Sequence, residues 1–561
     1  MKYIIVGAVA GGASTAARLR RMDEKAEIVI FEKGEYISYA NCGLPYYIGD
    51  VIKDRNKLFV QTAAAFNKRF NIDVRVKTEV TSIDPARKTI KATNLLTGGV
   101  YEESYDKLVL SPGAEPIRPP LPGIGLPGIF TLRNVSDTDY IKQYVDERKA
   151  GRAVIVGGGF IGLEMAENLH ALGMQITIIE MGNQILAPLD YTMAALVQNH
   201  IRSKGVALQL NTTVAGFESA GNGLKVLLKD EGAIEADVVI LSIGVRPDTK
   251  LAVAAGLKLG AAKGIYVNEF LQTSDPNIYA VGDAIEFSNL ITGASMSTYL
   301  AGPANKQGRI CANNIVMGNK DVYHGAINTA IVKVFDMTAG TTGVAAKHLK
   351  AANIPYLVST THSGSHAGYY PDSKLMSIQI TFSPDTGKLL GAQVVGYDGT
   401  DKRLDVLSSV IKNNGTIYDL AEFEHAYAPP YSSAKDPINM SGFVADNILQ
   451  KRLRIIYWNE VADISPDDLL LDVRSPEEFA KGTIPGAVNL PVDELRGRIN
   501  ELPKDKYIYI FCQIGLRGYL AQRILLQNGF EKVQNISGGY ALWSVCAREQ
   551  ALARFNQPVR N

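Results

Sequence analysis

The sequence predicts an α/β protein made of several domains, and three observations support this class. Two glycine-rich turns, each between an apolar strand and a helix, lie about 150 residues apart. A further apolar strand near the C-terminal end stops at a cysteine. With 561 residues, the chain is also too long for a single hydrophobic core. Strands and helices that alternate through glycine turns are typical of parallel sheets covered by helices.

The first glycine turn opens the chain. It follows a strand over Lys2–Val6 and precedes a helix over 13–21 and a second strand over 27–31. This order is the dinucleotide-binding fingerprint, in which a helix N-terminus faces the pyrophosphate and an acid accepts from the ribose hydroxyls. Val9 replaces the second glycine of the usual pattern, and a purely structural turn is the alternative. The candidate binding residues here are Gly7, Gly11, Gly12, Glu32 and Lys33.

The second glycine turn repeats the pattern in full. It lies between a strand ending at Val156 and a predicted helix over 163–172, and a strand over 176–179 follows. An acid at the end of that strand hydrogen-bonds a free 2′-hydroxyl and repels a 2′-phosphate, which favours NADH and leaves NADPH open. The candidate residues are Gly157, Gly159, Gly162 and Glu180.

The composition narrows the classes of partner. The net charge is +1 with both signs mixed along the chain, so we expect no nucleic acid and no membrane surface as partner. No apolar run reaches the length of a spanning helix, and the glycine-rich N-terminal run is unlike a signal sequence, so we expect a cytoplasmic enzyme with small-molecule substrates. The cysteines lack the paired spacing of a zinc site or a disulfide framework, and we expect reactive thiols and no metal: Cys42, Cys311, Cys512 and Cys546.

Segments 110–114, 244–247 and 278–283 resemble those of two-unit flavoprotein reductases. The resemblance implies FAD at the first turn and the nicotinamide at the second. It also gives Asp283 a hydrogen bond to the ribityl chain, whereas a helix-capping role is the alternative. The further cofactor-binding residues that it implies are Val80, Ser111, Gly113, Gly244, Ala301 and Asn305.

One cysteine lies in a segment with a more specific likeness. Residues 38–45, 301–305, 366–371 and 425–431 resemble coenzyme A-disulfide reductase, over about residues 1–445. A lone thiol cannot close an internal disulfide, so its oxidised form is a mixed disulfide, a persulfide or a sulfenic acid. The resemblance makes Cys42 the nucleophile, which we expect to be a thiolate favoured by flavin and polar neighbours. The alternative, a buried apolar cysteine, is preferred for Cys311 and Cys546.

The same resemblance implies bound coenzyme A and a homodimer. Tyr369 and Tyr427 correspond to tyrosines that reach the active site from the partner subunit, and packing in the dimer core is the alternative. Basic residues that could hold the phosphates could equally be solvated surface charges. The residues assigned to coenzyme A are Ser14, Arg18, Arg21, Ser38, Asn41 and Lys435, with Lys68 or Arg69 assisting.

The last hundred residues resemble a single rhodanese domain. A buried strand over 469–474 and the segment 482–489 precede a strand over 507–511 that ends at Cys512. The turn after it can direct several backbone N–H groups at one sulfur atom, and Arg517 adds positive charge. We therefore expect Cys512 to carry sulfane sulfur; an inactive fold used for docking is the alternative.

Together these features predict a flavoprotein disulfide reductase fold with two dinucleotide-binding domains, an α+β dimerisation domain and an α/β rhodanese domain. The predicted boundaries are 1–112 with 245–322 for FAD, 113–244 for NAD(P)H, 323–447 for dimerisation and 455–561 for rhodanese. The predicted activity is FAD-dependent reduction of persulfide, polysulfide or coenzyme A persulfide sulfur by NAD(P)H. The alternatives are a coenzyme A-disulfide reductase, an NADH oxidase, and a sulfurtransferase or sulfur-sensing scaffold.

Overall fold

The computed structural model describes residues 1–230 and 232–555. The chain forms two compact units. The first consists of residues 1–178 and 214–328, and the second of residues 179–213 together with the chain from Thr329 onward.

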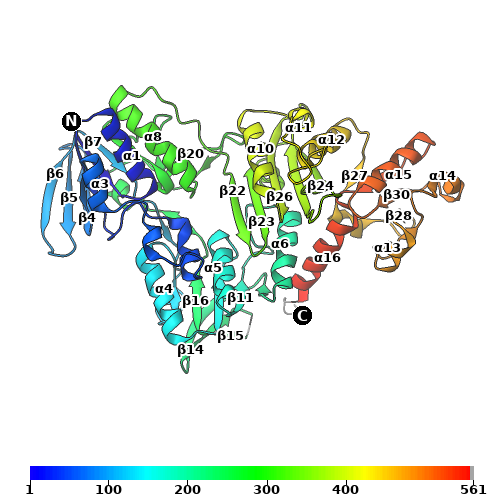
Figure 1. The fold of residues 1–561 in the computed structure, drawn as a ribbon, viewed down its shortest axis with the longest axis horizontal. Coiled ribbons are helices and arrows are strands. Elements are labelled where there is room, and N and C mark those ends of the chain that lie inside the picture. The colour runs from blue at the N-terminus through cyan, green and yellow to red at the C-terminus, as the bar shows by residue number, and fades with distance from the viewer. Residues whose placement is uncertain (231, 556–561) are drawn as a thin grey trace. The chain divides into compact units, whose positions relative to one another are not determined.

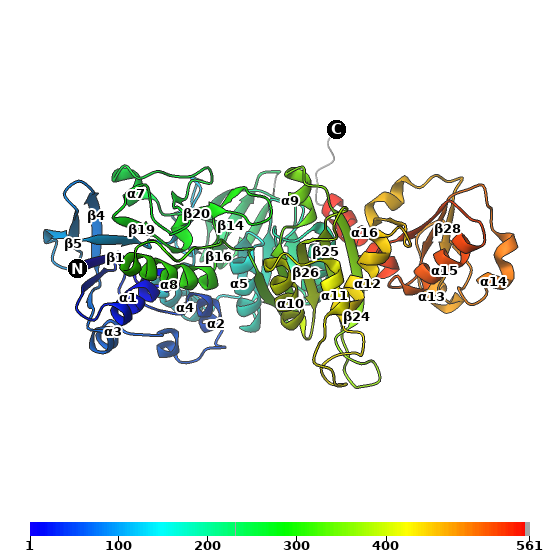
Figure 2. The same ribbon diagram turned by 90° about the horizontal axis from the view of Figure 1, so that it is seen from above.

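The first unit contains a parallel sheet that positions the first glycine turn. Its strand order is β19-β7-β1-β2-β3, with bounds Ile278–Ala280, Lys107–Leu110, Lys2–Val6, Glu27–Phe31 and Asp73–Arg75. Helices α1 (Ala10–Met22) and α8 (Ala301–Met317) pack against each other beside this sheet (Figures 1 and 2). Because the strands are parallel, the segments that follow β1, β2, β7 and β19 meet at one edge of the sheet. The site candidates lie in those segments.

Smaller sheets and a helix complete this half of the first unit. Strands β4, β5 and β6 form an antiparallel sheet (Thr78–Asp84, Thr89–Asn94 and Val100–Ser104). Strand β8 (Ala114–Pro116) pairs with β17 (Val245–Pro247), and β18 (Ile265–Tyr266) pairs with β20 (Ile285–Ser288). Helix α3 (Ala63–Phe70) begins at Thr62, whose side chain caps it.

A second sheet of the first unit holds the second glycine turn. Strand β10 (Arg152–Val156) lies beside β16 (Val238–Leu241), which pairs with β9 (Ile129–Phe130). Helix α5 (Phe160–Ala171) follows β10, and α4 (Val135–Arg148) begins with a capping box at Asn134. Helix α2 (Leu44–Ile48) packs on α4 and α5, and this packing holds the segment that follows Cys42 against the second sheet's helices.

The predicted elements agree closely with the observed ones. The strands predicted over 2–6 and 27–31 have those bounds, whereas the helix predicted to begin at residue 13 begins at Ala10. The helix begins earlier than predicted because it starts inside the glycine turn. Val9 is its N-cap, and Ala10 is already helical.

The second unit contains an antiparallel sheet of order β22-β23-β26-β25-β24. The bounds are Ala330–Val334, Met337–Gly343, Leu389–Gly396, Leu375–Phe382 and Leu357–Gly364. Helices α10 (Thr400–Lys412), α11 (Ile417–Glu422) and α12 (Pro437–Leu449) pack beside it (Figure 2). Arg403 on α10 forms a fully buried ion pair with Asp436 at 2.8 Å and donates to the carbonyl oxygen of Ser365 at 2.9 Å. This pair ties together the loops that carry Tyr369 and Tyr427.

A parallel sheet near the C-terminal end belongs to the same unit. Its order is β27-β31-β30-β28-β29, with bounds Ile455–Ile456, Val533–Ile536, Ile508–Phe511, Leu469–Asp472 and Val488–Asn489. Helices α13 (Pro476–Ala480) and α15 (Leu516–Gln527) follow β28 and β30. The chain order of strand, loop and helix puts Cys512 at the carboxyl end of a central strand.

The helix α16 (Gly539–Phe555) packs on α6 (Tyr191–Ser203), a helix that is distant in sequence but belongs to the same unit. Glu549 of α16 is completely buried and accepts from the guanidinium of Arg202 at 3.1 Å. The rings of Tyr191 and Trp458 stack 5.4 Å apart beside this contact. The helix pair is therefore joined by both a buried charge pair and apolar packing.

Candidate active site

The glycines of the first turn are required by close backbone packing. Gly7 has a φ of +97°, and a Cβ built there would lie 2.1 Å from the carbonyl oxygen of Ser111. A Cβ on Gly12 would lie 1.9 Å from the carbonyl oxygen of Gly7. Both distances are far inside van der Waals contact, so only glycine allows strand, turn and helix to come this close.

The second turn reproduces this geometry. A Cβ on Gly157 would lie 2.5 Å from the carbonyl oxygen of Ser242, and one on Gly162 would lie 2.1 Å from the carbonyl oxygen of Gly157. Gly159 is the N-cap of α5 with a φ of −82°, and Val9 is the N-cap of α1 with a φ of −100°. Because neither φ is positive, this position does not require glycine for its φ, and valine stands where the usual pattern has glycine.

A cleft of about 590 Å³ opens beside the first turn. Glu32 lies in its wall and accepts from the backbone N–H groups of Ala8 at 2.9 Å and Gly34 at 2.7 Å. Burial raises the pKa of Glu32, and these hydrogen bonds oppose the rise. The predicted residues that line the cleft are Gly7, Gly11, Glu32, Lys33, Asn41, Ser111, Gly113 and Asp283.

The cleft has the features that a flavin dinucleotide needs. The N-terminus of α1 faces the cleft across a turn of glycine and small apolar residues, where a pyrophosphate could bind, and the Glu32 carboxylate could accept hydrogen bonds from a ribose. Asp283 lies 3.9 Å from the guanidinium of Arg133, and burial raises its pKa. The sequence analysis missed Arg133, which also lines the cleft. The residues present therefore fit FAD.

Some predicted cofactor residues lie elsewhere in the first unit. Val80 belongs to the hydrophobic core, and Gly12 lies behind the turn against Gly7. Ala301 and Asn305 are in the first turns of α8, where Ala304 is the residue that lines the cleft. Gly244 precedes β17 with a φ of +111°.

The predicted basic residues on α1 belong to a larger cationic group. Desolvation and then the positive charges of Arg309 and Arg21 lower the pKa of Arg18, while the carboxylate of Asp321 opposes the shift. Arg18 donates to the Asn313 side chain at 2.9 Å, and Ser14 hydrogen-bonds Asn305. Sequence reasoning missed Arg309, which α8 contributes. Arginines gathered on two neighbouring helices are suited to binding phosphates.

The other residues assigned to coenzyme A are spread over the chain. Arg20 donates to the carbonyl oxygens of Phe70 and Asn71, both at 2.8 Å, and so fixes the end of α3 where Lys68 and Arg69 are exposed. Ser38 has a φ of +44°, and its N–H donates to the Ala8 carbonyl oxygen at 2.8 Å. Lys435 belongs to the second unit and is exposed before α12.

Cys42 lies in a short 3₁₀ turn, Asn41–Gly43, directly before α2. It is exposed, whereas the other three cysteines are buried. Partial burial raises the pKa of the Cys42 thiol, and the carboxylates of Glu164 and Asp283 raise it further. This differs from the expectation that polar neighbours favour the thiolate, because both charged neighbours are negative.

Glu164 is a neighbour of Cys42 that the sequence analysis did not single out. Burial and the charge of Glu167 raise the pKa of Glu164 to about 7, and a hydrogen bond from Tyr46 opposes this rise. Tyr46 lies on α2 and Glu164 on α5, which pack together. In the sequence, Glu164 could have been identified by its position two residues after Gly162, within the second fingerprint.

We expect the Glu164→Gln substitution to lower the pKa of the Cys42 thiol. The change removes a negative charge that disfavours the thiolate, although the larger effect of burial stays. A lower pKa means more thiolate at neutral pH, so alkylation of Cys42 by iodoacetamide should become about threefold faster. The measurement is the alkylation rate against pH, followed by mass spectrometry of the Cys42 peptide.

The matched control is Glu167→Gln. Glu167 acts on Glu164 and not directly on Cys42, and its removal favours the ionised form of Glu164. Alkylation of Cys42 should therefore stay the same or become slower. A faster reaction in both variants would show that the effect is not specific to Glu164.

The predicted tyrosines meet in the second unit. The hydroxyl oxygens of Tyr369 and Tyr427 are 2.8 Å apart, and this hydrogen bond raises the pKa of Tyr369. Both side chains are exposed. The two phenols are therefore joined by one hydrogen bond at the exposed surface of the second unit.

The loop after β30 places one backbone donor at the sulfur of Cys512. The Cys512 Sγ accepts from the N–H of Gly515 at 3.1 Å, and the positive charge of Arg517 interacts with Cys512. Gly515 has a φ of +118° and is the N-cap of α15. Cys512 is only 1% exposed. The sulfur atom therefore lies at a helix N-terminus, with one backbone N–H group and one cation beside it.

Two ion pairs surround this loop, and sequence reasoning missed both carboxylates. Arg517 forms a bidentate pair with Glu478, at 2.6 and 2.7 Å, which lowers the pKa of Glu478 to about 2. Asp472 and Arg474 form a buried pair at 2.6 Å. Both acids could have been considered from the sequence. They lie in the segment 469–478, which precedes the predicted strand that ends at Cys512.

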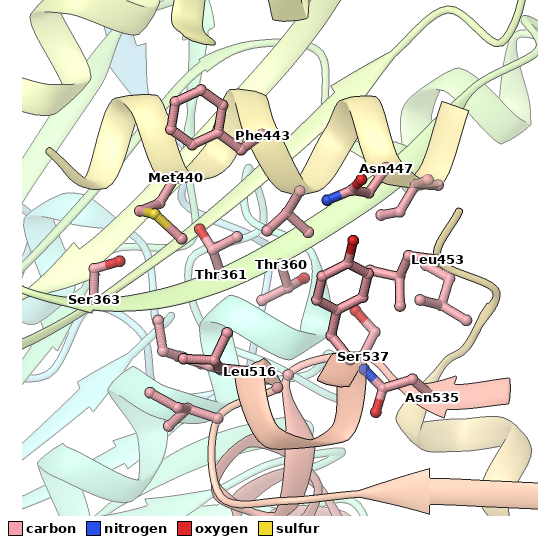
Figure 3. Close-up of a pocket in the computed structure, with 18 residues that line it drawn as sticks. Thr360, Thr361, Ser363, Met440, Phe443, Asn447, Leu453, Leu516, Asn535 and Ser537 are labelled. Carbon is pink, nitrogen blue, oxygen red and sulfur yellow. The ribbon is translucent and has the colours of Figure 1, made fainter. Parts of the chain in front are cut away.

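A pocket of about 170 Å³ adjoins the same loop (Figure 3). Its lining includes Ile514, Gly515 and Leu516 of this loop and Met440, Phe443 and Asn447 of helix α12. Figure 3 shows Leu516 on the side of the pocket opposite α12. Within the described chain, the residues that line the pocket include no Asp, Glu, Lys or Arg. His362 is also in the wall, and burial lowers its pKa to about 4, so it is neutral at pH 7.

Cys311 and Cys546 are both buried, and burial raises the pKa of each thiol well above its usual range. This arrangement supports the apolar interpretation of these two cysteines. Across residues 1–230 and 232–555, no group of His, Cys, Asp and Glu side chains is arranged to hold a metal ion. The helices in those ranges include none that is long and apolar enough to cross a membrane.

Three family models match successive parts of the chain. Residues 1–306 match pyridine nucleotide-disulphide oxidoreductase, residues 329–437 match the dimerisation domain of that family, and residues 457–546 match the rhodanese-like domain. A coenzyme A disulfide reductase of Staphylococcus epidermidis is 38% identical over 445 residues, which are 79% of this chain and 99% of that protein.

Two solved structures are similar over nearly the whole chain. Reduced CoADR-RHD of Bacillus anthracis is 50% identical, with a TM-score of 0.96 over 98% of each chain. An NAD-dependent persulfide reductase from A. fulgidus is 39% identical, with a TM-score of 0.91 over 97% of this chain and all of that one. These likenesses confirm the predicted fold class, and the family implies FAD and NAD(H) as cofactors. The chain therefore belongs to the pyridine nucleotide-disulphide oxidoreductases, with a rhodanese-like domain as its C-terminal part.

Proposed function

We propose that the chain is an NADH-dependent flavoenzyme that reduces the sulfur–sulfur bond of small persulfides, with coenzyme A persulfide and polysulfide as candidate substrates. The observation that carries the proposal is the pairing of two thiols of different kinds. Cys42 is exposed in a segment whose neighbour Asn41 lines the dinucleotide cleft, and Cys512 lies in a donor-lined loop of a rhodanese-like domain. One site supplies electrons and the other supplies sulfur.

The cofactor roles follow from the two turns. Glu32 and the first glycine turn hold the FAD dinucleotide, and Asp283 binds its ribityl chain. Glu180, which accepts from the N–H of Gly182 at 2.7 Å, presents a carboxylate that suits the 2′-hydroxyl of NADH and repels the 2′-phosphate of NADPH. Bound FAD supplies hydride acceptance from NADH and two-electron delivery to sulfur.

Coenzyme A is held by cations and small polar groups. The clustered charges of Arg18, Arg21 and Arg309 support binding of its phosphates, because charge-assisted hydrogen bonds to phosphate are among the strongest in proteins. Exposed Lys68 or Arg69 extends this group. The further contacts that we propose are Ser14, Ser38, Asn41 and Lys435.

Cys42 is the nucleophile toward the substrate. Its thiolate attacks one sulfur of the donor's sulfur–sulfur bond, a new sulfur–sulfur bond to Cys42 forms, and the other sulfur leaves with the electron pair as thiolate or sulfide. Two electrons then release the bound sulfur and restore the Cys42 thiolate. Since Cys42 is surrounded by carboxylates, the chain's own charges favour its thiol form before substrate binds.

The tyrosine pair and the dimerisation domain suggest a homodimer. In this proposal Tyr369 and Tyr427 donate a proton to the leaving sulfur at the partner subunit's active site. The cytoplasm is the expected location, because the catalytic thiol must remain reduced.

The test compares sulfur substrates with the purified holoenzyme and NADH under anaerobic conditions. We expect kcat/KM for coenzyme A persulfide to exceed that for coenzyme A disulfide by about tenfold or more, as NADH oxidation measures it. A preference for the disulfide would favour the activity named for the Staphylococcus epidermidis relative. Rapid NADH consumption in air without added sulfur would instead favour an oxidase.

A further inference from the structure

We propose that Glu478 makes the Cys512 loop select organic persulfides, which carry at most one negative charge on sulfur, and reject the thiosulfate dianion. This inference rests on the proposed function, because it specifies the donor from which Cys512 takes sulfane sulfur. It identifies Glu478 as a residue that determines specificity.

Arg517 is a cation near the Cys512 sulfur. Its positive charge interacts with Cys512, and two of its guanidinium nitrogens bind the two carboxylate oxygens of Glu478 at 2.6 and 2.7 Å. About a third of each side chain is exposed, so the pair borders the solvent from which a donor arrives. An arginine that is paired in this way offers an incoming anion neither a free fork nor a net positive charge.

The other cation near the loop is also paired. Arg474 donates to the Gln513 side chain at 3.1 Å and lies 4.2 Å from the centre of the Tyr540 ring. Its partner Asp472 is completely buried and bonds it at 2.6 Å. Each arginine at the loop therefore has its own carboxylate, and the charges of the two pairs cancel.

The net charge at the loop matters because of how sulfane sulfur is transferred to Cys512. The Cys512 thiolate attacks the sulfane sulfur, a bond between the two sulfur atoms forms, and the donor's own sulfur–sulfur bond breaks. From an organic persulfide the electron pair leaves on a thiolate, which takes up a proton. From thiosulfate it leaves on sulfite, and a dianion must first approach a negatively charged sulfur. Without surplus positive charge, that approach is repulsive.

The surroundings of the loop favour the same donor class. The pocket beside Ile514, Gly515 and Leu516 is lined by uncharged residues, including Met440, Phe443 and Leu453 (Figure 3). Transfer of an inorganic dianion into such surroundings is costly, whereas an organic group gains from it. An uncharged organic substituent therefore has a place to bind against the loop that carries Cys512.

The experiment measures sulfur loading on Cys512 by intact mass, in a Cys42→Ser background so that the exposed thiol is absent. The donors are N-acetylcysteamine persulfide, which has an uncharged organic group and at most one negative charge on sulfur, and thiosulfate, which has two negative charges. The parent protein should load about tenfold faster from the persulfide. Glu478→Gln should raise the rate with thiosulfate about tenfold and change the rate with the persulfide less than about twofold.

Glu477→Gln is the matched control, because Glu477 is the neighbouring acid on the same helix but is not the partner of Arg517. It should leave both rates unchanged. Glu478→Asp keeps the charge and should keep the rejection of thiosulfate. In the parent protein, added salt should speed loading from thiosulfate, because screening weakens the repulsion. This measurement needs no Glu478 variant and tests whether the loop repels an anion, so slower loading from thiosulfate with added salt would overturn the inference even if Glu478→Gln does not fold.

The outcomes separate the inference from the proposed function. Equal loading of the parent protein from both donors, or no gain with thiosulfate in a folded Glu478→Gln protein, would overturn the role of Glu478 and leave Cys512 as a carrier. Loading from neither donor would overturn the carrier role itself, and the inference with it.

Discussion

Replacing Cys42 with serine is expected to lower kcat/KM for NADH-dependent persulfide reduction by about a thousandfold or more. A serine hydroxyl cannot form the sulfur–sulfur bond to the substrate, and the other three cysteines are buried. The FAD cleft is formed by other residues, so flavin content should be unchanged. The rate of NADH oxidation with coenzyme A persulfide, measured on variant with full flavin absorbance, checks this expectation.

Cys311→Ala is the control for this prediction. Cys311 lies fully buried in α8, and burial raises its pKa far above neutrality, so its thiol is inert. This variant should keep its turnover within about twofold, with at most a loss of stability from the small cavity. If Cys42→Ser kept a substantial share of the parent activity, the single-thiol mechanism would be wrong.

Gly12→Ala is expected to prevent FAD binding and to destabilise the first unit. The new Cβ would lie 1.9 Å from the carbonyl oxygen of Gly7, and backbone atoms cannot yield as a flexible side chain can. Relief requires α1 to move away from β1, at a cost of about 3 kcal/mol in the free energy of unfolding. Flavin absorbance per chain and the thermal unfolding midpoint measure both effects.

Gly159→Ala provides the comparison within the second turn. A Cβ on Gly159 meets no atom within 4 Å, and its φ of −82° suits alanine. This variant should retain FAD and change the free energy of unfolding by less than about 1 kcal/mol. A Gly12→Ala protein that binds FAD as the parent does would show that the close contact of helix and turn is not needed for the cleft.

The glycine turns and their strands could be predicted because they depend on local sequence. A glycine with a positive φ before a helix is visible as a motif, and the strands over 2–6 and 27–31 were predicted with their observed bounds. The pairs around the cysteines could not be predicted in this way. Glu478 and Arg517 are 39 residues apart, and only the folded sheet brings them to one edge.

The direction in which the pKa of Cys42 shifts also could not be predicted from the sequence. Its pKa depends on burial and on the charge of Glu164. Glu164 lies on helix α5, more than a hundred residues further along the chain. Arg133 and Arg309 reach their sites through α4 and α8 packing in the same manner. Motifs identify which residues are chemically able to act, but the charge that each one meets is set by tertiary contacts.

The buried pairing of Glu549 with Arg202 means that deleting the C-terminal domain is not a clean subtraction. A chain that ended near residue 447 would lose α16 and leave Arg202 without its carboxylate and the α6 surface around Ala195 open to water. Such a protein would differ from the parent in stability as well as in sulfur supply. The contribution of Cys512 is therefore better isolated by a single-atom change to serine than by truncation.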